Sequence, residues 1–344
     1  MDALWYAILA AMLTAWAVLD GFDFGAGIVQ RIVAKTPDER AMILAAIGPV
    51  WDGNEVWLVA AGGVFVFAFP HAYAVAMSGM YLPLVMVLWL LVFRGVSIGL
   101  RGQVPNRLWQ DGWDIMFSVS STVMTLVVGV ALGNVVRGVP IDDSGWVELD
   151  LFSIGAHREG AIDAYTGLLG VFAVVVLGAH GATYLAWKTE GELRARCVAA
   201  ARSAWLVATG FFVAVTAITA LERPDMVRTF AGRPWLWPFP CVAAAAPFWA
   251  RTVLVRAREL SAFLASSAFI ASLLVATAGA LYPALLHSTL GSARDIDANR
   301  FASGSRGLEV ALAWWVPAMA LAVVYFINLF RSVRGKVRPE DARH

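Results

Sequence analysis

Charged residues are scarce in this sequence: Asp, Glu, Lys and Arg make up 15% of its 344 residues, and the net charge is only +1. Proteins that grip nucleic acid through its phosphates carry a basic surface, which this charge balance does not supply. Hydrophobic residues make up 60% of the chain and its mean hydropathy is +0.69. Such values are typical of a protein that crosses a membrane many times.

Cysteine and histidine are also scarce. Cys197 and Cys241 lack the spacing of metal ligands, so we expect two free thiols and no metal site. A haem held by this chain would need His or Met at opposed depths on neighbouring helices. Of the histidines, only His180 lies well inside an apolar segment, and we expect it to be a polar residue with ordinary hydrogen-bond partners. The other histidines are His71, His157, His287 and His344.

Long apolar segments dominate the remainder of the chain. Nine of them are long enough to cross about 30 Å of hydrocarbon, which predicts an all-α polytopic membrane protein. The predicted spans are 4–32, 50–69, 78–100, 113–136, 164–187, 203–221, 237–255, 262–286 and 309–330. Between the first two, Pro37 opens a short amphipathic segment that we expect at the membrane interface.

The spacing of the spans is compatible with two four-helix bundles plus one helix. We divide the chain into a first bundle (1–140), an acidic periplasmic loop (141–162), a second bundle (163–290), and a loop, ninth helix and basic tail (291–344). The acidic loop should be a solvated cap, and residues 288–308 should be irregular. The acidic residues of the first loop are Asp142, Asp143, Glu148, Asp150 and Glu159.

The basic residues predict the orientation. Eight Lys and Arg residues lie on the N-terminal side of the predicted spans and seventeen on the other side, while Arg94 lies inside the third span. Because cytoplasmic segments carry the excess of Lys and Arg, the N-terminus should be periplasmic and the C-terminus cytoplasmic.

Four carboxylates stand inside these apolar segments: Asp20 and Asp23 in the first span, Asp52 and Glu55 in the second. Each costs at least about 2.5 kcal/mol in hydrocarbon, so we expect all four to face protein. Residues three apart share a helix face, and both pairs fall at a similar depth in the cytoplasmic half of the membrane. Asn54 adds an amide beside them.

Several roles are open for these residues. Arg94 either extends to the membrane interface beside Arg101 or forms an ion pair with Asp23, Asp52 or Glu55. The acids could be structural hydrogen-bond partners of helix ends, could bind a cation, or could relay protons. No oxygen-rich loop surrounds them to complete a cation site. Four acids beside one base cannot all be neutralised by pairing, which favours proton relay.

These motifs resemble those of subunit II of the cytochrome bd-type quinol oxidases. Residues 20–25 (DGFDFG) and 51–58 (WDGNEVWL) carry the likeness most specifically. It extends over nearly the whole chain, through Phe93-Arg94, 133–140 (GNVVRGVP), 181–185 (GATYL), 189–193 (TEGEL), 278–279 (AG) and 282–283 (YP).

The resemblance implies the non-haem subunit of an electrogenic quinol:oxygen oxidoreductase in the bacterial inner membrane. Subunit I would hold two b-type haems, one d-type haem and the quinol site. This chain would stabilise subunit I and provide no catalytic residue. Asp52, with Asp23 as a second candidate, would belong to a cytoplasmic proton path to the oxygen-reducing haem. Glu55 stands where many members have Gln, which resembles the cyanide-insensitive branch.

Further partners follow from the same resemblance. Some members include a small third subunit, and some hold a quinone in subunit II as a structural lipid, at positions that do not transfer to this sequence. We expect contacts with lipid and none with nucleic acid.

A stand-alone proton-coupled secondary transporter is the alternative hypothesis. The same buried acids and the glycine-interrupted first span would suit it. A transporter would move its substrate as the purified chain alone, whereas an oxidase subunit would co-purify in a one-to-one ratio with a haem-bearing membrane subunit.

Overall fold

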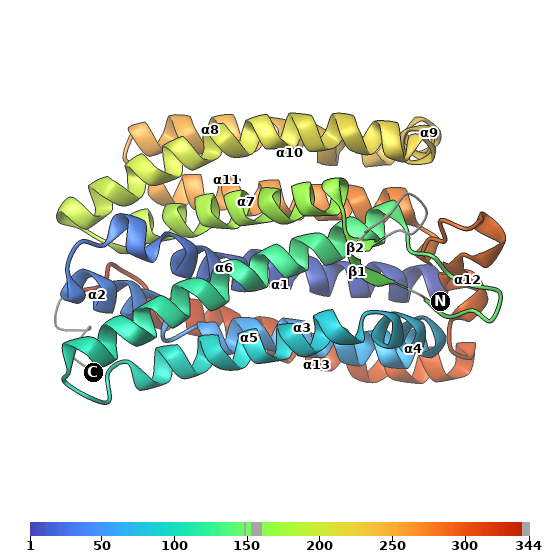
Figure 1. Ribbon diagram of the computed structural model, residues 1–344, viewed down its shortest axis with the longest axis horizontal. Coiled ribbons are helices and arrows are strands. Elements are labelled where there is room, and N and C mark those ends of the chain that lie inside the picture. The colour runs from blue at the N-terminus through green and yellow to red at the C-terminus, as the bar shows by residue number, and fades with distance from the viewer. Residues whose placement is uncertain (148, 153–159, 339–344) are drawn as a thin grey trace.

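The computed structural model describes residues 1–147, 149–152 and 160–338, and its long helices lie side by side in one elongated bundle (Figure 1). The end of α13 and the described residues after it, up to 338, lie with α2 at one end of the bundle, which we call the α2 end and predict to be cytoplasmic. The helices are α1 (Asp2–Val33), α2 (Pro37–Ile47), α3 (Trp51–Ala68), α4 (Pro70–Gly79), α5 (Tyr81–Leu100), α6 (Arg107–Arg137), α7 (Ala164–Lys188), α8 (Gly191–Glu222), α9 (Pro224–Gly232), α10 (Pro238–Val255), α11 (Glu259–Leu281), α12 (Ala298–Phe301) and α13 (Ser305–Ser332).

Among the described residues, eight helical segments are long and apolar enough to cross a membrane. They comprise α1, α5, α6, α7, α8, Pro234–Val255 (which includes α10), α11 and α13. The prediction of an all-α polytopic membrane protein is therefore confirmed. The predicted second span corresponds to α3, an 18-residue helix outside this set, because three polar side chains near its start lower its hydropathy. The count of nine spans and the orientation stay predictions.

Several predicted boundaries were wrong, and three of them have a clear local reason. The third span is interrupted at Met80, because the ring of Pro83 clashes with the carbonyl four residues earlier. The eighth span ends at Leu281, because Pro283 cannot continue a helix. The sixth span begins much earlier, at Gly191, because hydropathy detects only the apolar part of a helix that extends beyond the membrane.

The segments at the α12 end are more ordered than the sequence suggested. The predicted irregular loop contains β4 (Ile296–Asp297), which pairs antiparallel with β3 (Ala284–Leu286), and the short helix α12. The acidic loop contains β1 (Asp150–Phe152), paired in parallel with β2 (Gly160–Ile162). Val139 and Ile141, around the start of the acidic loop, are buried in a cluster with Trp5 and Leu308, whereas Asp143 is exposed. Glu148, His157, Glu159 and His344 lie outside the described residues.

The interfacial segment predicted at Pro37 is a helix, α2. The hydroxyl of Thr36 accepts a hydrogen bond from the Glu39 backbone N–H at 3.2 Å, and the Glu39 carboxylate accepts one from the Thr36 N–H at 3.3 Å. This reciprocal cap fixes where the helix begins. Glu39 also binds Arg196 of α8. Burial raises the pKa of Glu39, but the Lys35 backbone N–H and the Arg196 guanidinium outweigh burial and hold that pKa below its ordinary value.

Helix α1 occupies the centre of the bundle and contacts α3, α6, α7 and α11. Its contact with α7 depends on glycine: a Cβ on Gly25 would lie 2.0 Å from the Leu177 carbonyl oxygen, and one on Gly181 would lie 2.1 Å from the Gly25 carbonyl carbon. Small residues permit this approach of two backbones, a common packing device within bilayers. Since α1 contacts helices of both proposed four-helix bundles, the division into two bundles stays a prediction.

Substituting Gly181→Ala should destabilise the fold by about 3 kcal/mol or more, because the added methyl would overlap the α1 backbone. Gly167→Ala, on the same helix with nothing within 4 Å of the added methyl, is the matched control. The thermal unfolding midpoint of the purified protein measures both. Equal midpoints for the two variants would contradict the close α1–α7 contact.

Candidate functional site

Two carboxylates of α1, Asp20 and Asp23, are completely buried. The nearest cation is Arg94 of α5, which is equally buried, and its Nη1 lies 2.7 Å from Asp20 Oδ1. The Trp16 indole N–H donates to Asp20 Oδ2 at 2.9 Å. The guanidinium of Arg94 lies over the Phe24 ring, 4.1 Å from its centroid. The charge of Asp20 is therefore balanced inside the protein.

Arg94 also approaches α3. Its Nη2 lies 3.7 Å from Glu55 Oε2, and the Glu55 side chain is 19% exposed. Of the two alternatives that the sequence left open, the structure places Arg94 in an ion pair. The expected partner list was incomplete, because Asp20 provides the closest carboxylate oxygen and the sequence alone did not nominate it.

Asp23 has an amide as its partner. Asn54 Nδ2 donates to Asp23 Oδ2 at 2.8 Å and to the Leu19 carbonyl at 3.1 Å, which ties α3 to α1. Within the described part of the chain, Asp23 Oδ1 and Asn54 Oδ1 have no hydrogen-bond partner. A buried carboxylate without its own cation is costly when ionised. Asp23 is therefore suited to take up and release a proton.

Asp52 does not join this group. Its side chain is exposed on the chain taken by itself, so it does not share the interior of this chain with the other three acids. The reason is its position in the first turn of α3: Asn54 points inward to α1, and Asp52 is two residues away on the opposite side of the helix. The structure thus brings Asp20, Asp23 and Glu55 together and leaves Asp52 at the surface.

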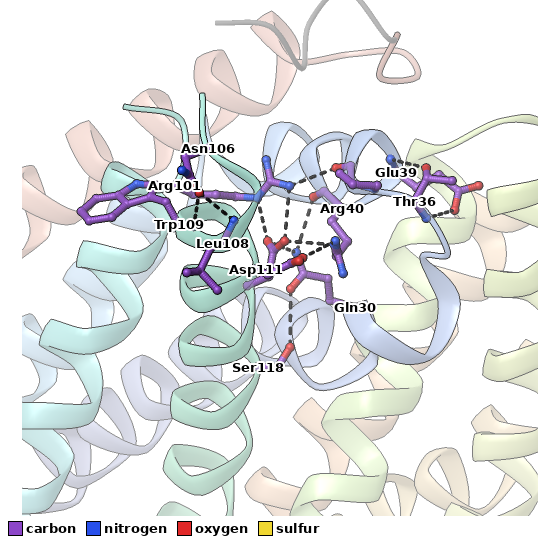
Figure 2. A network of polar contacts seen from close by, with 12 residues as sticks. Gln30, Thr36, Glu39, Arg40, Arg101, Asn106, Leu108, Trp109, Asp111 and Ser118 are labelled. Atoms are coloured by element: carbon purple, nitrogen blue, oxygen red, sulfur yellow. Dashed lines mark hydrogen bonds and ion pairs between the residues drawn. The ribbon is translucent and has the colours of Figure 1, made fainter. Parts of the chain in front are cut away.

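A second buried carboxylate cluster, missed by the sequence analysis, lies at the α2 end (Figure 2). Asp114 of α6 is completely buried, with its Oδ2 3.0 Å from Arg40 Nε and its Oδ1 accepting from Arg101 Nε at 2.7 Å. Arg40 Nη2 also lies 2.6 Å from Asp111 Oδ1. Gln30 of α1 donates to Asp114 Oδ1 at 3.4 Å. The rule that selected Asp20, an acid inside an apolar span, would also have selected Asp114.

His180 is buried, and both of its ring nitrogens have hydrogen-bond partners in the protein. Its Nδ1 lies 2.7 Å from Ser266 Oγ and its Nε2 lies 3.0 Å from the Val18 carbonyl oxygen. Its ring stacks on Phe263 with 5.1 Å between centroids. Within the described ranges there is no group of three or more side chains placed to bind a metal ion.

Known proteins match this chain over almost its whole length. The family model for cytochrome bd terminal oxidase subunit II matches residues 1–333. Cytochrome bd ubiquinol oxidase subunit 2 of Bacillus subtilis is 32% identical, with 89% of this chain and 88% of that protein covered. Cytochrome bd-I ubiquinol oxidase subunit 2 of Escherichia coli K12 is 29% identical, with 98% and 95% covered.

One solved structure is similar in fold. A chain of the bd oxidase from Geobacillus thermodenitrificans superposes with a TM-score of 0.73, and the match covers 96% of this chain and 98% of that one. Sequence identity in this match is 17%, so it speaks for the fold alone.

Removing the buried cation should be strongly destabilising. Arg94→Gln leaves Asp20 ionised without its balancing cation, at an expected cost of about 3–5 kcal/mol. The double variant Asp20→Asn, Arg94→Gln should recover much of that loss, because no lone charge remains. Thermal unfolding of the purified protein tests both, with Arg31→Gln at an exposed site on α1 as the control. A single variant as stable as the double variant would show that the ion pair does not hold these helices.

Proposed function

Because the chain belongs to the family of cytochrome bd terminal oxidase subunit II, and is therefore a membrane subunit of a bacterial quinol oxidase complex, we propose that its buried acids conduct protons. Its partner is the haem-bearing subunit I of that complex. Reduction of oxygen to water consumes protons, and a haem buried in the membrane needs a polar route for their supply. In this proposal the route draws on the cytoplasm and passes through Glu55, Asp20, Asp23 and Asn54.

The observation that carries this proposal is the charge imbalance at the centre of the bundle. Three carboxylates, Asp20, Asp23 and Glu55, share the single cation Arg94 among the described side chains of this group. Like charges at close range in a poorly polarisable interior repel strongly, so the group is most stable with a proton on one of its acids. A proton that is held but exchangeable is what a relay needs.

Arg94 is the positioning residue of this relay. It lies between Asp20 on α1 and Glu55 on α3, so protonation of either acid strengthens the hold of the guanidinium on the other. Glu55, which is partly exposed, can exchange protons with the exterior of the chain, while Asp23 accepts them inside. Asn54 holds Asp23 in place through one oxygen and leaves the other oxygen for the transferred proton.

Asp52 has a different place in the proposal. Its exposed side chain follows directly after Trp51 at the start of α3, on the outside of this chain. There it can transfer protons between this group and subunit I. The family resemblance, which assigns Asp52 to the path, supports this role.

Other contacts also remain proposals. Two b-type haems and one d-type haem in subunit I, a small third subunit and a structural quinone are expected from the family resemblance. Exposed apolar side chains on α5 and α13, among them Trp89, Trp314 and Leu321, offer surface for subunit I, lipid or quinone. The family of this chain favours the oxidase subunit over a stand-alone transporter, although the buried acids alone would suit either.

Asp23→Asn tests the proposal directly. The amide preserves the shape of the side chain and its contact with Asn54 but cannot carry the proton. Oxygen consumption by the purified complex at saturating quinol should fall roughly 10-fold or more, as expected when a proton-transfer group is removed. Its haem absorption spectrum should be unchanged.

Asp38→Asn, at an exposed carboxylate of α2, is the control and should retain normal turnover. Normal turnover of the Asp23→Asn complex with full haem content would leave this chain only a scaffolding role.

A further inference from the structure

We propose that protons reach Asp23 through a polar seam inside this chain, between α1 and α6, that begins at the Asp114 cluster. The seam consists of Asp114, Gln30, Ser118 and Ser121. This inference rests on the proposed function, since it names the entry route for the same relay. It differs from entry at the partly exposed Glu55, and the two routes can be tested separately.

The seam follows one face of α1. Asp23, Gly27 and Gln30 are spaced by four and three residues, so they lie on the same side of the helix. That side meets α6: a Cβ on Gly27 would lie 2.2 Å from Ser121 Oγ. The Ser121 hydroxyl therefore lies against α1 at the level of Gly27, between the turn that carries Asp23 and the turn that carries Gln30.

The Ser121 hydroxyl is unusual among its neighbours. It is completely buried and has no hydrogen-bond partner in the described part of the chain. By contrast, Ser120 donates to the Phe117 carbonyl at 3.2 Å and Thr125 to the Ser121 carbonyl at 2.8 Å. A buried hydroxyl left unpaired is costly, and buried polar groups of this kind are commonly satisfied by water.

The Asp23 carboxylate, about one helical turn from Gly27 along α1, also has an unpaired oxygen atom: its Oδ1 has no hydrogen-bond partner among the residues that the structure describes. Four residues of helix separate Asp23 from Gly27, a rise of about 6 Å. This separation suits one water molecule that donates to the carboxylate and contacts the Ser121 hydroxyl.

Below Ser121 the seam continues to the α2 end. The Ser118 hydroxyl donates to Gln30 Oε1 at 3.4 Å, and Gln30 Nε2 donates to Asp114 Oδ1 at 3.4 Å (Figure 2). Both contacts are long for hydrogen bonds, which leaves them easy to rearrange. Gln30 is completely buried, so no lipid reaches this part of the route.

The Asp114 cluster, which consists of Asp114, Asp111, Arg40 and Arg101, is the entrance to the seam. Asp111 is 40% exposed and Arg40 14% exposed, so the cluster extends from water to the buried Asp114. Arg40 and Arg101 balance the two acids Asp111 and Asp114. A proton entering here therefore meets no net positive charge, which would otherwise repel it.

Transfer along the seam moves one proton at a time between oxygen atoms, with water carrying it past Gln30. The Gln30 amide nitrogen has no free lone pair to accept a proton, so this side chain holds Asp114 and Ser118 in place and does not carry the proton itself. The Ser121 hydroxyl accepts a proton from the side of Gln30 and Ser118 and releases its own toward Asp23. The Asp23 carboxylate becomes neutral on receiving it and is ionised again when it passes the proton onward to the oxygen-reducing subunit. No electron moves, and no other group changes its charge.

The test compares Ser121→Val with Ser121→Thr in the purified oxidase complex. These side chains have nearly the same shape, so any steric effect at Gly27 is shared and only the hydroxyl differs. We expect the valine variant to take up protons and consume oxygen roughly 10-fold more slowly than the threonine variant, with equal haem spectra and an equal KM for quinol. Ser120→Ala, the neighbouring buried serine, should match the unsubstituted complex.

The test of the seam and the test of the proposed function can fail independently of each other. Equal rates for the valine and threonine variants, together with a slow Asp23→Asn complex, would overturn the seam and leave entry at Glu55. Equal rates with a normal Asp23→Asn complex would overturn both proposals. Should neither variant at 121 assemble with haem, Gln30→Met interrupts the seam at its other end and should slow proton uptake to a similar extent, and normal uptake would contradict the seam.

Discussion

The pairing of one buried guanidinium with several buried acids is the constraint on which the rest of this structure depends. Arg94 comes from α5, Asp20 and Asp23 from α1, and Glu55 from α3. An isolated charge in this environment would cost several kcal/mol, so these three helices must keep their relative depth and rotation to keep the charges together. The proposed relay uses the same arrangement, because an excess of acids over bases leaves a proton to exchange.

The glycines of α1 make this arrangement geometrically possible. Gly25 brings α1 against Gly181 of α7, and Gly27 admits Ser121 of α6. The two contacts lie on different sides of α1 and together fix its rotation, so that Asp20 meets Arg94 of α5 and Asp23 meets Asn54 of α3. One helix thereby combines two requirements: tight packing on its glycine positions and polar contacts on its acid positions.

Much of this could be predicted from the sequence, because apolar length and buried acids are local properties. Hydropathy located the helices and failed where Pro83 and Pro283 interrupted an apolar segment. The residues of the group were identified, whereas the closest ion-pair partner and the exposure of Asp52 were not, because both depend on how α1, α3 and α5 are rotated against one another. Asp114 meets the same criterion as Asp20, an acid inside an apolar span. The sequence analysis missed it because it lies near the start of a predicted span.

The most direct test of the central claim is the infrared difference spectrum between the oxidised and reduced complex, in the region of the carboxylic acid C=O stretch. The account predicts a band that shifts in heavy water and is lost when Asp23 is replaced by asparagine, because this side chain gains and loses a proton during turnover. The same band in both complexes would show that Asp23 keeps one protonation state throughout and would contradict the account.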